Sequence, residues 1–446
     1  MQNLYVNFNS KLFFRRHQSK DQFTGDATLN ISGSEKVLNI NPDAFEILEL
    51  LDRNLTIRAC VETLESRYGM DKKILSGIVN EIVNQFKENG MAELSETAPL
   101  RKKSFIPACL ENDFLIKAVN VELLSKCNLK CRHCYGEFGP GSTSELSTKT
   151  VICILDQLKI LQCKNIIFTG GEVLLRDDFL DILEYGDYQN FSLSFLTNGT
   201  LVTPGMVERL GKIEGLEVQV SVDGSTAEVH DFLRGKGNFD RAIRGLELLK
   251  NTGCNLYIAM VLNKSNYKNL EEMETLAKRM NAELNISTMI KSGEAVRNLR
   301  ELYIEPSFFY DICKMDTSNH IKESNQVHDS DDIPTDGYIE RCNAGKGRFS
   351  IKANGDVVTC HLFPHIDKFL MGSIHQSSIT DIVYNYNREE RLGDLNAFNI
   401  KECKNCPHIA KCKGGCMAVA YAEYGDINNP NPFSCAWFRA LSEGKK

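Results

Sequence analysis

The stretch Cys127-Asn128-Leu129-Lys130-Cys131-Arg132-His133-Cys134-Tyr135 places three cysteines close together in the chain. Thiolates at this spacing can bind one soft metal centre. A [4Fe–4S] cluster is held by cysteine thiolates and takes four ligands, so three cysteines leave one iron atom open. An open coordination position distinguishes a catalytic metal site from a closed structural one. The alternative is a zinc knuckle, but zinc spacings usually come as paired Cys-x-x-Cys hairpins, and no second pair follows nearby.

Composition and length limit the function classes. The chain has 446 residues, which suggests about three domains, and it is 42% hydrophobic and 25% charged, as is typical of a globular protein. A net charge of −7 argues against a nucleic-acid partner. The chain contains no apolar run long enough to span a membrane and no signal-peptide pattern, so we expect a cytoplasmic protein. Sixteen cysteines then indicate metal sites, not disulfides.

Residues 1–95 are expected to form a small leading domain. Residues 4–15 and 27–40 alternate roughly between apolar and polar side chains, which predicts strands. Three helical patterns follow; Pro42 opens the first, Thr56 heads the second, and Asp71 caps the third. Strands followed by three helices predict a winged-helix-like unit. Residues 96–112 are expected to be a linker.

Residues 113–305 alternate between strand and helix patterns, which predicts βαβ units and a parallel sheet. Residues 306–335 are interpreted as an irregular bridge. Strands are expected at 118–124, 165–169, 192–197, 217–222, 255–262 and 283–290. Helices are expected near 148–162, 178–188, 204–212, 239–251 and 270–280.

The three cysteines follow the first of these strands, at the end where parallel β/α sheets carry their chemistry. With the aromatic Tyr135 after them, they resemble the cysteine motif of the radical S-adenosylmethionine (SAM) family. That family is built on a partial (β/α)6 barrel, and the count of six predicted strands agrees with it. The resemblance implies an α/β fold in which Cys127, Cys131 and Cys134 hold a SAM-binding [4Fe–4S] cluster.

Other strand ends carry residues that the same resemblance assigns to SAM. Gly170, Gly171 and Glu172 match the family's Gly-Gly-Glu segment, which binds the amino group of SAM. Val173 replaces the proline that usually follows. Asn198, Ser221 and Arg234 match stretches near the ribose and carboxylate, and Tyr135 completes the expected cofactor contacts. The alternative for Asn198, Asp223 and Arg234 is turn and cap chemistry. A glycine at 293 is expected to approach the methionine half of SAM.

Residues 336–446 contain seven cysteines at spacings that resemble the SPASM domain, which binds two auxiliary [4Fe–4S] clusters. A zinc ribbon is the alternative, but it would use four or eight ligands. The resemblance assigns Cys342, Cys360 and Cys416 to the first auxiliary cluster. It assigns to the second the ligands Cys403, Cys406, Cys412 and Cys435. The first cluster is one ligand short, so it has an open iron or a fourth ligand from elsewhere. His361, His365 and His408 are expected to lie beside ligands without being ligands.

The leading domain resembles the leader-peptide recognition domain of enzymes that modify ribosomally made peptides. In that family an extended leader adds a strand to the domain's sheet, which is β-augmentation. The corresponding strand here would be residues 36–40. A DNA-binding winged helix and a plain packing domain are the alternatives. Against DNA binding, the third helical pattern has no cluster of basic residues: Lys72, Lys73 and Lys87 are balanced by acidic neighbours.

The order of the three parts resembles radical SAM/SPASM peptide maturases, above all the sactipeptide and ranthipeptide thioether synthases. The resemblance implies SAM and three [4Fe–4S] clusters as cofactors, and an electron donor of the flavodoxin or ferredoxin type. It implies a cysteine-containing precursor peptide, bound through its leader. A 5′-deoxyadenosyl radical would take a hydrogen atom from the peptide, and a substrate cysteine would then bond to that carbon.

Alternative functions are a maturase that forms carbon–carbon crosslinks or another peptide oxidation, including the sulfatase-activating kind. An iron–sulfur DNA-binding redox sensor is the alternative that is not an enzyme. It leaves the segment Gly170-Gly171-Glu172 without an explanation.

Overall fold

The computed structural model describes most of the chain, which divides into two units. One unit comprises Met1–Leu115 with Ile154–Lys164 and Tyr185–Ser192, and the other comprises Ile116–Cys153, Asn165–Glu184 and Leu193–Lys446. The described residues are 3–8, 12–16, 27–31, 37–52, 55–97, 116–315, 338–389 and 391–443. No helix in these ranges is long and apolar enough to cross a membrane. The expected linker lies mostly outside the described residues.

The first unit contains the three predicted helices. They are α1 (Pro42–Asp52), α2 (Ile57–Tyr68) and α3 (Lys72–Glu88). The Thr56 side chain accepts a hydrogen bond from the Ala59 backbone at the start of α2, and Asp71 caps α3, as predicted. Buried side chains of the three helices form one apolar core with those of strands β1 (Tyr5–Phe8) and β5 (Ala92–Ser95). The β5 strand, which pairs antiparallel with β1, was not predicted.

A separate antiparallel sheet in this unit has the order β2-β3-β4. Its strands are β2 (Leu12–Arg16), β3 (Ala27–Ile31) and β4 (Val37–Ile40). The β4 strand pairs with β3 on one side and is an edge strand among the described residues. An edge strand presents unpaired backbone groups to which another strand can add.

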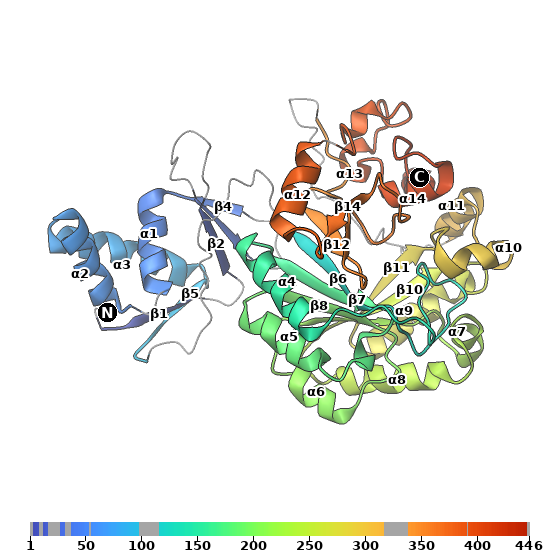
Figure 1. Cartoon of the computed structure of the whole chain (residues 1–446), viewed down its shortest axis with the longest axis horizontal. Coiled ribbons are helices and arrows are strands. Elements are labelled where there is room, and N and C mark those ends of the chain that lie inside the picture. The colour runs from blue at the N-terminus through green and yellow to red at the C-terminus, as the bar shows by residue number, and fades with distance from the viewer. Residues whose placement is uncertain are drawn as a thin grey trace. The chain divides into compact units, whose positions relative to one another are not determined.

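The second unit is organised by a sheet with the strand order β11-β10-β9-β8-β7-β6-β12-β13-β14 (Figure 1). Strands β6 to β11 run in sequence order, as a β/α barrel segment requires, and match the six predicted strands closely. Their bounds are β6 Ala118–Leu124, β7 Asn165–Gly170, β8 Ser192–Thr197, β9 Glu217–Ser221, β10 Asn255–Leu262 and β11 Glu283–Thr288.

The helices between these strands also follow the prediction, with one addition. Helix α7 (Ala227–Arg234) occupies a stretch that we had interpreted as a strand-end loop. The other elements are α4 Thr148–Ile160, η1 Val173–Leu175, α5 Phe179–Tyr188, α6 Pro204–Leu210, α8 Asn238–Leu249, η2 Tyr267–Asn269, α9 Leu270–Arg279, η3 Gly293–Asn298 and α10 Leu299–Leu302. Helices α6 and α8 lie along the same side of the sheet (Figure 1).

The two faces of the sheet differ in burial. Phe168 on β7 and Phe195 on β8 are fully buried against Phe179 of α5, so this face packs against helices. On β10 the alternating positions Tyr257 and Val261 are only half-buried, on the opposite face. This period-two pattern leaves the concave face of the barrel accessible.

Strands of the C-terminal region extend the barrel sheet. Strand β12 (Arg348–Ile351) pairs parallel with β6, and β13 (Asp356–Val358) and β14 (Leu370–Ser373) continue antiparallel. A turn at Gly355, which has a left-handed φ of 88°, connects β12 to β13. The remaining elements are α12 Ile379–Arg388, η4 Ala397–Asn399, α13 Ile409–Cys412, α14 Met417–Tyr424 and α15 Pro432–Glu443.

The prediction of an irregular bridge was wrong for its first ten residues. Pro306–Met315 forms helix α11, which packs against α15. The Phe309 ring lies edge-on to Phe433, with ring centroids 5.3 Å apart. The apolar side chains of this segment therefore serve a helix–helix contact. The rest of the expected bridge, residues 316–335, lies outside the described residues.

Candidate functional site

The three clustered cysteines lie on the loop that leaves the carboxyl end of β6, as predicted. The Cys127 backbone amide donates to the Gly139 carbonyl (3.1 Å), and the Cys134 amide donates to the Cys131 carbonyl (3.3 Å). The Leu129 amide lies 3.5 Å from the Cys127 sulfur and donates to it. These backbone contacts fold the loop into a compact turn and hold its thiol groups near one another.

The three thiols share a buried electrostatic environment. Burial raises the pKa of Cys127 to about 11 and that of Cys131 to about 12, and the neighbouring Cys134 thiol raises the pKa of both. Each thiol is therefore within electrostatic range of the others. Burial therefore favours the neutral thiols, so ligation by a metal would release protons.

The donor set fits an iron–sulfur cluster better than a single ion. Among the described residues, no three Cys, His, Asp or Glu side chains are placed to hold one metal ion together. A zinc ion needs its ligands to converge on one tetrahedral centre. A [4Fe–4S] cluster binds each cysteine through a different iron atom, so its ligands are spread more widely. Cysteine thiolates are also the donor type that such clusters use.

Gly170 and Gly171 are required by close packing against the cysteine loop. A Cβ atom at Gly170 would lie 2.2 Å from the Leu124 carbonyl oxygen, and one at Gly171 would lie 2.1 Å from that of Lys126. Both neighbours are backbone atoms, which cannot move aside. The Gly171 and Glu172 amides donate to these carbonyls at 2.8 and 3.0 Å. The two glycines thus fix the end of β7 against the loop that carries the thiols.

The Glu172 carboxylate is fully buried and satisfied within the chain. It accepts hydrogen bonds from the Leu174 amide (3.1 Å), the Thr197 hydroxyl (2.7 Å) and the Asn198 amide (2.7 Å). Burial nevertheless raises the pKa of Glu172. This side chain joins the ends of β7 and β8.

Asn198 connects the end of β8 to the cysteine loop. Its side-chain amide donates to the Asn128 side chain (2.8 Å), and its carbonyl oxygen accepts from the Thr200 amide (2.9 Å). Asn128 in turn donates to the Thr200 hydroxyl (2.9 Å). The turn chemistry considered for Asn198 is therefore present, and it holds the segment between Cys127 and Cys131.

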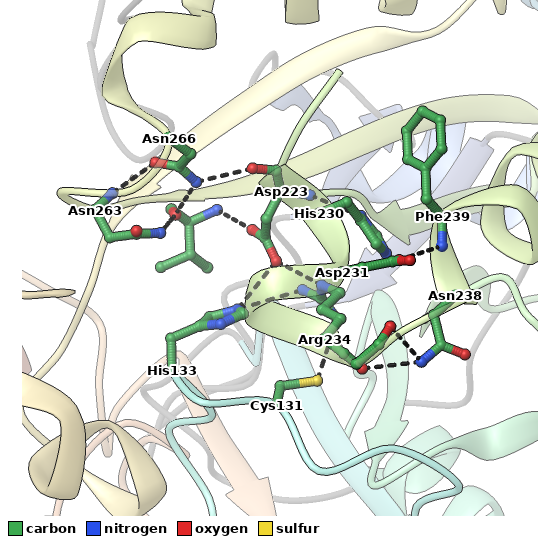
Figure 2. A network of polar contacts seen from close by, with 12 residues as sticks. Cys131, His133, Asp223, His230, Asp231, Arg234, Asn238, Phe239, Asn263 and Asn266 are labelled. Atoms are coloured by element: carbon green, nitrogen blue, oxygen red, sulfur yellow. Dashed lines mark hydrogen bonds and ion pairs between the residues drawn. The ribbon is translucent and has the colours of Figure 1, made fainter. Parts of the chain in front are cut away.

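Arg234 belongs to a buried charge network (Figure 2). Its Nε donates to the Asp223 carboxylate at 2.5 Å, and its Nη1 lies 3.8 Å from the Cys131 sulfur. His133 contributes its Nε2, 3.1 Å from the same carboxylate. The Asp223 carboxylate is fully buried, and the nearby Arg234 charge holds its pKa well below the usual range. The guanidinium that we assigned to the SAM carboxylate thus also touches a thiol of the site.

A second layer of contacts fixes Asp223 from the other side. Its carboxylate accepts a hydrogen bond from the Val261 amide (2.8 Å), and its backbone carbonyl accepts one from Asn266 (3.0 Å). The buried His230 ring accepts a hydrogen bond from the Asp223 amide through Nδ1 (3.3 Å). The sequence analysis missed the roles of Asp223, His133 and His230. The only local signal was the presence of polar residues at the end of β9 and within the cysteine motif.

Tyr135 and Ser221 occupy different surroundings. The Tyr135 ring makes edge contacts with Phe138 and with His361, at 5.6 and 5.4 Å between ring centroids. Burial raises the pKa of Tyr135 strongly, and the nearby Glu122 carboxylate adds to this. Glu122 is itself buried and paired with Lys352 at 2.6 Å. Ser221 lies half-buried at the end of β9.

Gly293 has a structural explanation that the sequence analysis did not provide. A Cβ atom there would lie 2.5 Å from the Tyr135 carbonyl carbon, and its φ of 56° is left-handed. The Ala295 amide donates to the Cys134 carbonyl at 3.1 Å. This glycine therefore approaches the backbone of the cysteine loop. It was expected to approach SAM.

The first predicted C-terminal cysteine set draws its members from the ends of three different elements. Cys342 precedes β12 and Cys360 follows β13, whereas Cys416 precedes α14. Burial raises the pKa of Cys360 to about 12, and the Cys416 and Cys342 thiols both raise it further. Cys360 is thus within electrostatic range of both of the other thiols.

The second set is also grouped. Burial raises the pKa of Cys403 to about 11, and Cys435 and Cys406 are the thiols that contribute most to the rise. Cys412 ends helix α13, and the Gly415 amide donates to its carbonyl (2.8 Å). The chain reverses its direction here, between Cys412 of the second set and Cys416 of the first set.

The three histidines beside the cysteines have other partners or surroundings. Burial lowers the pKa of His361 to about 4, and its ring contacts Tyr135. His365 lies 2.9 Å from the Asp356 carboxylate, and His408 lies 2.7 Å from the Ser442 hydroxyl. The expectation that these histidines are not ligands stays a prediction.

Two family models match the chain. The model of the radical SAM superfamily matches residues 121–277, which include the cysteine loop and the strand ends described above. The SPASM model, described as an iron–sulfur cluster-binding domain, matches residues 342–407.

Relatives extend the similarity over most of the chain. Mycofactocin maturase MftC of Mycolicibacterium smegmatis is 32% identical over 319 residues, which are 70% of this chain and 80% of that protein. The antilisterial bacteriocin subtilosin biosynthesis protein AlbA of Bacillus subtilis is 26% identical over 407 residues. That match covers 87% of this chain and 86% of AlbA.

Solved structures share the fold. Streptococcus suis SuiB bound to its precursor peptide SuiA has a TM-score of 0.60 at 15% identity, and the match covers 96% of this chain and 99% of SuiB. A structure of anSMEcpe with bound AdoMet has a TM-score of 0.56 at 20% identity, over 74% of this chain and 96% of that one. The SuiB match also covers the leading unit.

Proposed function

We propose that this chain, which belongs to the radical SAM superfamily and is a radical SAM/SPASM peptide maturase, installs thioether crosslinks in a cysteine-containing precursor peptide. The observation that carries the proposal is a repeated shortage of ligands. Cys127, Cys131 and Cys134 form one set of three thiols, and the first C-terminal set is also three. A [4Fe–4S] cluster takes four ligands, so each set leaves a position for something else. The similarity to AlbA over most of both chains supports a sulfur-bonding maturase.

The first open position suits SAM, whose reductive cleavage at the cluster supplies the 5′-deoxyadenosyl radical when both are bound. In this proposal Gly170, Gly171 and Glu172 form the wall that faces the amino group, and Arg234 and Ser221 lie toward the carboxylate and ribose. The buried Asp223 keeps the Arg234 guanidinium oriented. Asn198 holds the loop between the first two cysteines, so the cofactor-binding surface is rigid before SAM arrives.

The second open position suits a thiolate of the substrate. Cys342, Cys360 and Cys416 are half-buried, and a soft metal site with a vacant ligand position favours a deprotonated thiol. The closure of the bond removes one hydrogen atom from the acceptor carbon and one proton and one electron from the thiol. The electron leaves through the auxiliary sites. The second set, with Cys403, Cys406, Cys412 and Cys435, has four thiols and needs no ligand from the substrate.

The leading unit is proposed to bind the leader of the precursor by strand addition. Strand β4 is an edge strand of the described three-stranded sheet, and its unpaired side is the position where we propose that the leader pairs. We expect a fluorescent leader peptide to bind the full-length protein, and a precursor without its leader to be modified much more slowly. Equal rates with and without the leader would contradict this role.

The test of the thioether uses the reconstituted protein with SAM, a low-potential reductant such as reduced flavodoxin, and the precursor peptide. The proposal predicts that each crosslink removes two hydrogen atoms from the peptide mass and protects one cysteine from alkylation. A precursor with that cysteine changed to alanine is the control and should keep its mass. Unchanged peptide together with normal 5′-deoxyadenosine formation would contradict the substrate assignment.

A peptide oxidation without a sulfur bond is the second candidate. It is favoured by the higher identity to the mycofactocin maturase, 32% against 26% for AlbA. The same experiment separates the two candidates. Loss of hydrogen mass with all cysteines still open to alkylation would identify the second one.

A further inference from the structure

Arg341 is a buried cation that has no role in the site described above. Arg341 is 3% exposed and immediately precedes Cys342. The guanidinium donates to three backbone carbonyls: Nη1 to that of Ile427, and Nη2 to those of Gly414 (3.1 Å) and Asn429 (2.9 Å). No carboxylate among the described residues forms an ion pair with it, and the Nε atom is buried without a partner.

Such an arrangement is costly unless an anion lies nearby. A buried charge is normally paired, because carbonyl dipoles alone replace only part of its lost hydration. Arg341 directly precedes Cys342, and its Nη2 donates to the carbonyl of Gly414, which lies between the thiols Cys412 and Cys416 in the chain. These thiols belong to both C-terminal cysteine sets. The cation therefore lies within electrostatic range of both sets.

The loops around Arg341 are shaped to hold it there. Gly414 lies between Cys412 and Cys416, and its carbonyl also accepts a hydrogen bond from the Asn431 amide at 2.9 Å. A Cβ atom at Gly414 would lie 2.9 Å from the Arg341 Nε atom, so a larger residue would displace the guanidinium. The Asn431 carbonyl accepts from the Cys435 amide (3.1 Å), which connects the last cysteine to the same group of contacts.

We propose that Arg341 is the buried countercharge of the auxiliary iron–sulfur clusters and sets their reduction potentials. This inference rests on the proposed presence of clusters at the two C-terminal cysteine sets. Cysteine thiolates make such a cluster anionic, and each added electron makes it more negative. A fixed cation nearby stabilises the reduced form and raises the potential. The unused Nε–H is a donor available to a cluster or thiolate sulfur. Arg341 is in this account a positioning and tuning residue, not a catalytic one.

Arg348 does not take this role equally well. The Arg348 charge also lowers the pKa of the Cys342 and Cys360 thiols. However, Arg348 is exposed, so solvent screens its charge. Arg391 supplies a matched control in the same region. Its guanidinium also donates to two backbone carbonyls, those of Leu370 (2.9 Å) and Asp367 (2.8 Å), but it is partly exposed.

The experiment is a redox titration of the reconstituted full-length protein, followed by electron paramagnetic resonance. Cys127, Cys131 and Cys134 are changed to alanine in every sample, so that only auxiliary clusters contribute to the spectrum. We expect Arg341→Gln to shift at least one auxiliary midpoint potential to a more negative value. Arg341→Lys should shift it less, because the charge remains, and Arg391→Gln should leave the potentials unchanged. A loss of auxiliary iron in Arg341→Gln, with loading retained in Arg341→Lys, would also support the countercharge.

Three other outcomes would contradict the inference, and each has a different consequence for the proposed function. Auxiliary clusters whose potentials are the same in Arg341→Gln and in the parent would overturn the role of Arg341 and leave the proposed function standing. Equal loss of auxiliary iron in the Gln and Lys variants would reduce Arg341 to a scaffold for its three loops. Absence of auxiliary iron from the parent itself would overturn both the inference and the two-cluster part of the proposed function.

Discussion

At the scale of single residues, the buried pair of Asp223 and Arg234 makes the sharpest prediction. Arg234→Met leaves the Asp223 carboxylate buried without its cation, which should destabilise the protein by about 3–5 kcal/mol. Adding Asp223→Asn removes the uncompensated charge and should restore part of that loss. Chemical unfolding of the two single variants and the double variant measures the coupling. Additive effects of the two substitutions would contradict a direct interaction between them.

His230 predicts a dependence of stability on pH. Burial lowers its pKa from the ordinary 6.5 to about 4, so between these values the unfolded chain binds a proton that the folded chain does not. Stability is therefore complete above about pH 6.5 and falls as the pH drops toward 4, by about 3 kcal/mol in total. The His230→Gln variant should therefore lose less stability than the wild type between pH 7 and pH 5. The melting temperature of the protein reconstituted with iron–sulfur clusters measures this loss. Identical pH slopes would contradict this assignment.

Residues differ in how far the sequence predicts their roles. The cysteines were predictable because their spacing alone defines a ligand set. Asp223, His133 and Arg341 were not, because their partners lie far away in the chain: the Asp223 carboxylate meets His133 and Arg234 only when β9, α7 and the cysteine loop come together. Glycines 170 and 171 were predicted as a ligand contact, but the structure adds the carbonyls of Leu124 and Lys126 as their neighbours.

At the scale of elements, the junction of β7 with the cysteine loop should tolerate no side chain. Gly171→Ala would place a Cβ atom 2.1 Å from the Lys126 carbonyl oxygen and push the loop out of position. We expect the variant to lose SAM cleavage at least about tenfold, which is about 1.4 kcal/mol of transition-state stabilisation, and to bind less iron. Gly205→Ala in helix α6 is the control, because nothing lies within 4 Å of its added Cβ atom. Equal activity of the two variants would contradict the close packing.

The regular elements were predictable because their apolar periods are strong and long. Strands β6 to β11 and helices α1 to α3 follow the patterns in the sequence closely. The short β5 and α7 were missed because few residues specify them and their partners are distant in the chain, Tyr5–Phe8 for β5. Helix α11 was missed because its main partner, α15, is distant in the chain: Phe309 packs against Phe433.

At the scale of the whole molecule, the C-terminal cysteine region is continuous with the barrel sheet. Strand β12 pairs with β6, the strand that leads into the cysteine loop, with Ile351 opposite Val121. The ion pair between Glu122 and Lys352 lies one residue beyond this paired stretch. The Tyr135 ring contacts the ring of His361, the residue that follows Cys360 in the chain. Sequence spacing predicted two separate metal regions but not this continuity, since strand pairing between distant segments leaves no local pattern. The chemistry proposed for the two regions depends on their closeness.

The most direct test of the account measures two products in the same reactions, 5′-deoxyadenosine and crosslinked peptide. Changing Cys127, Cys131 and Cys134 to alanine should abolish both. Changing Cys342 or Cys416 to alanine should leave part of the 5′-deoxyadenosine and remove the crosslink, because SAM cleavage needs only the first set. Cys153→Ala, at an exposed position outside both sets, is the control and should retain both products. Full crosslinking by the Cys342 and Cys416 variants would contradict the account.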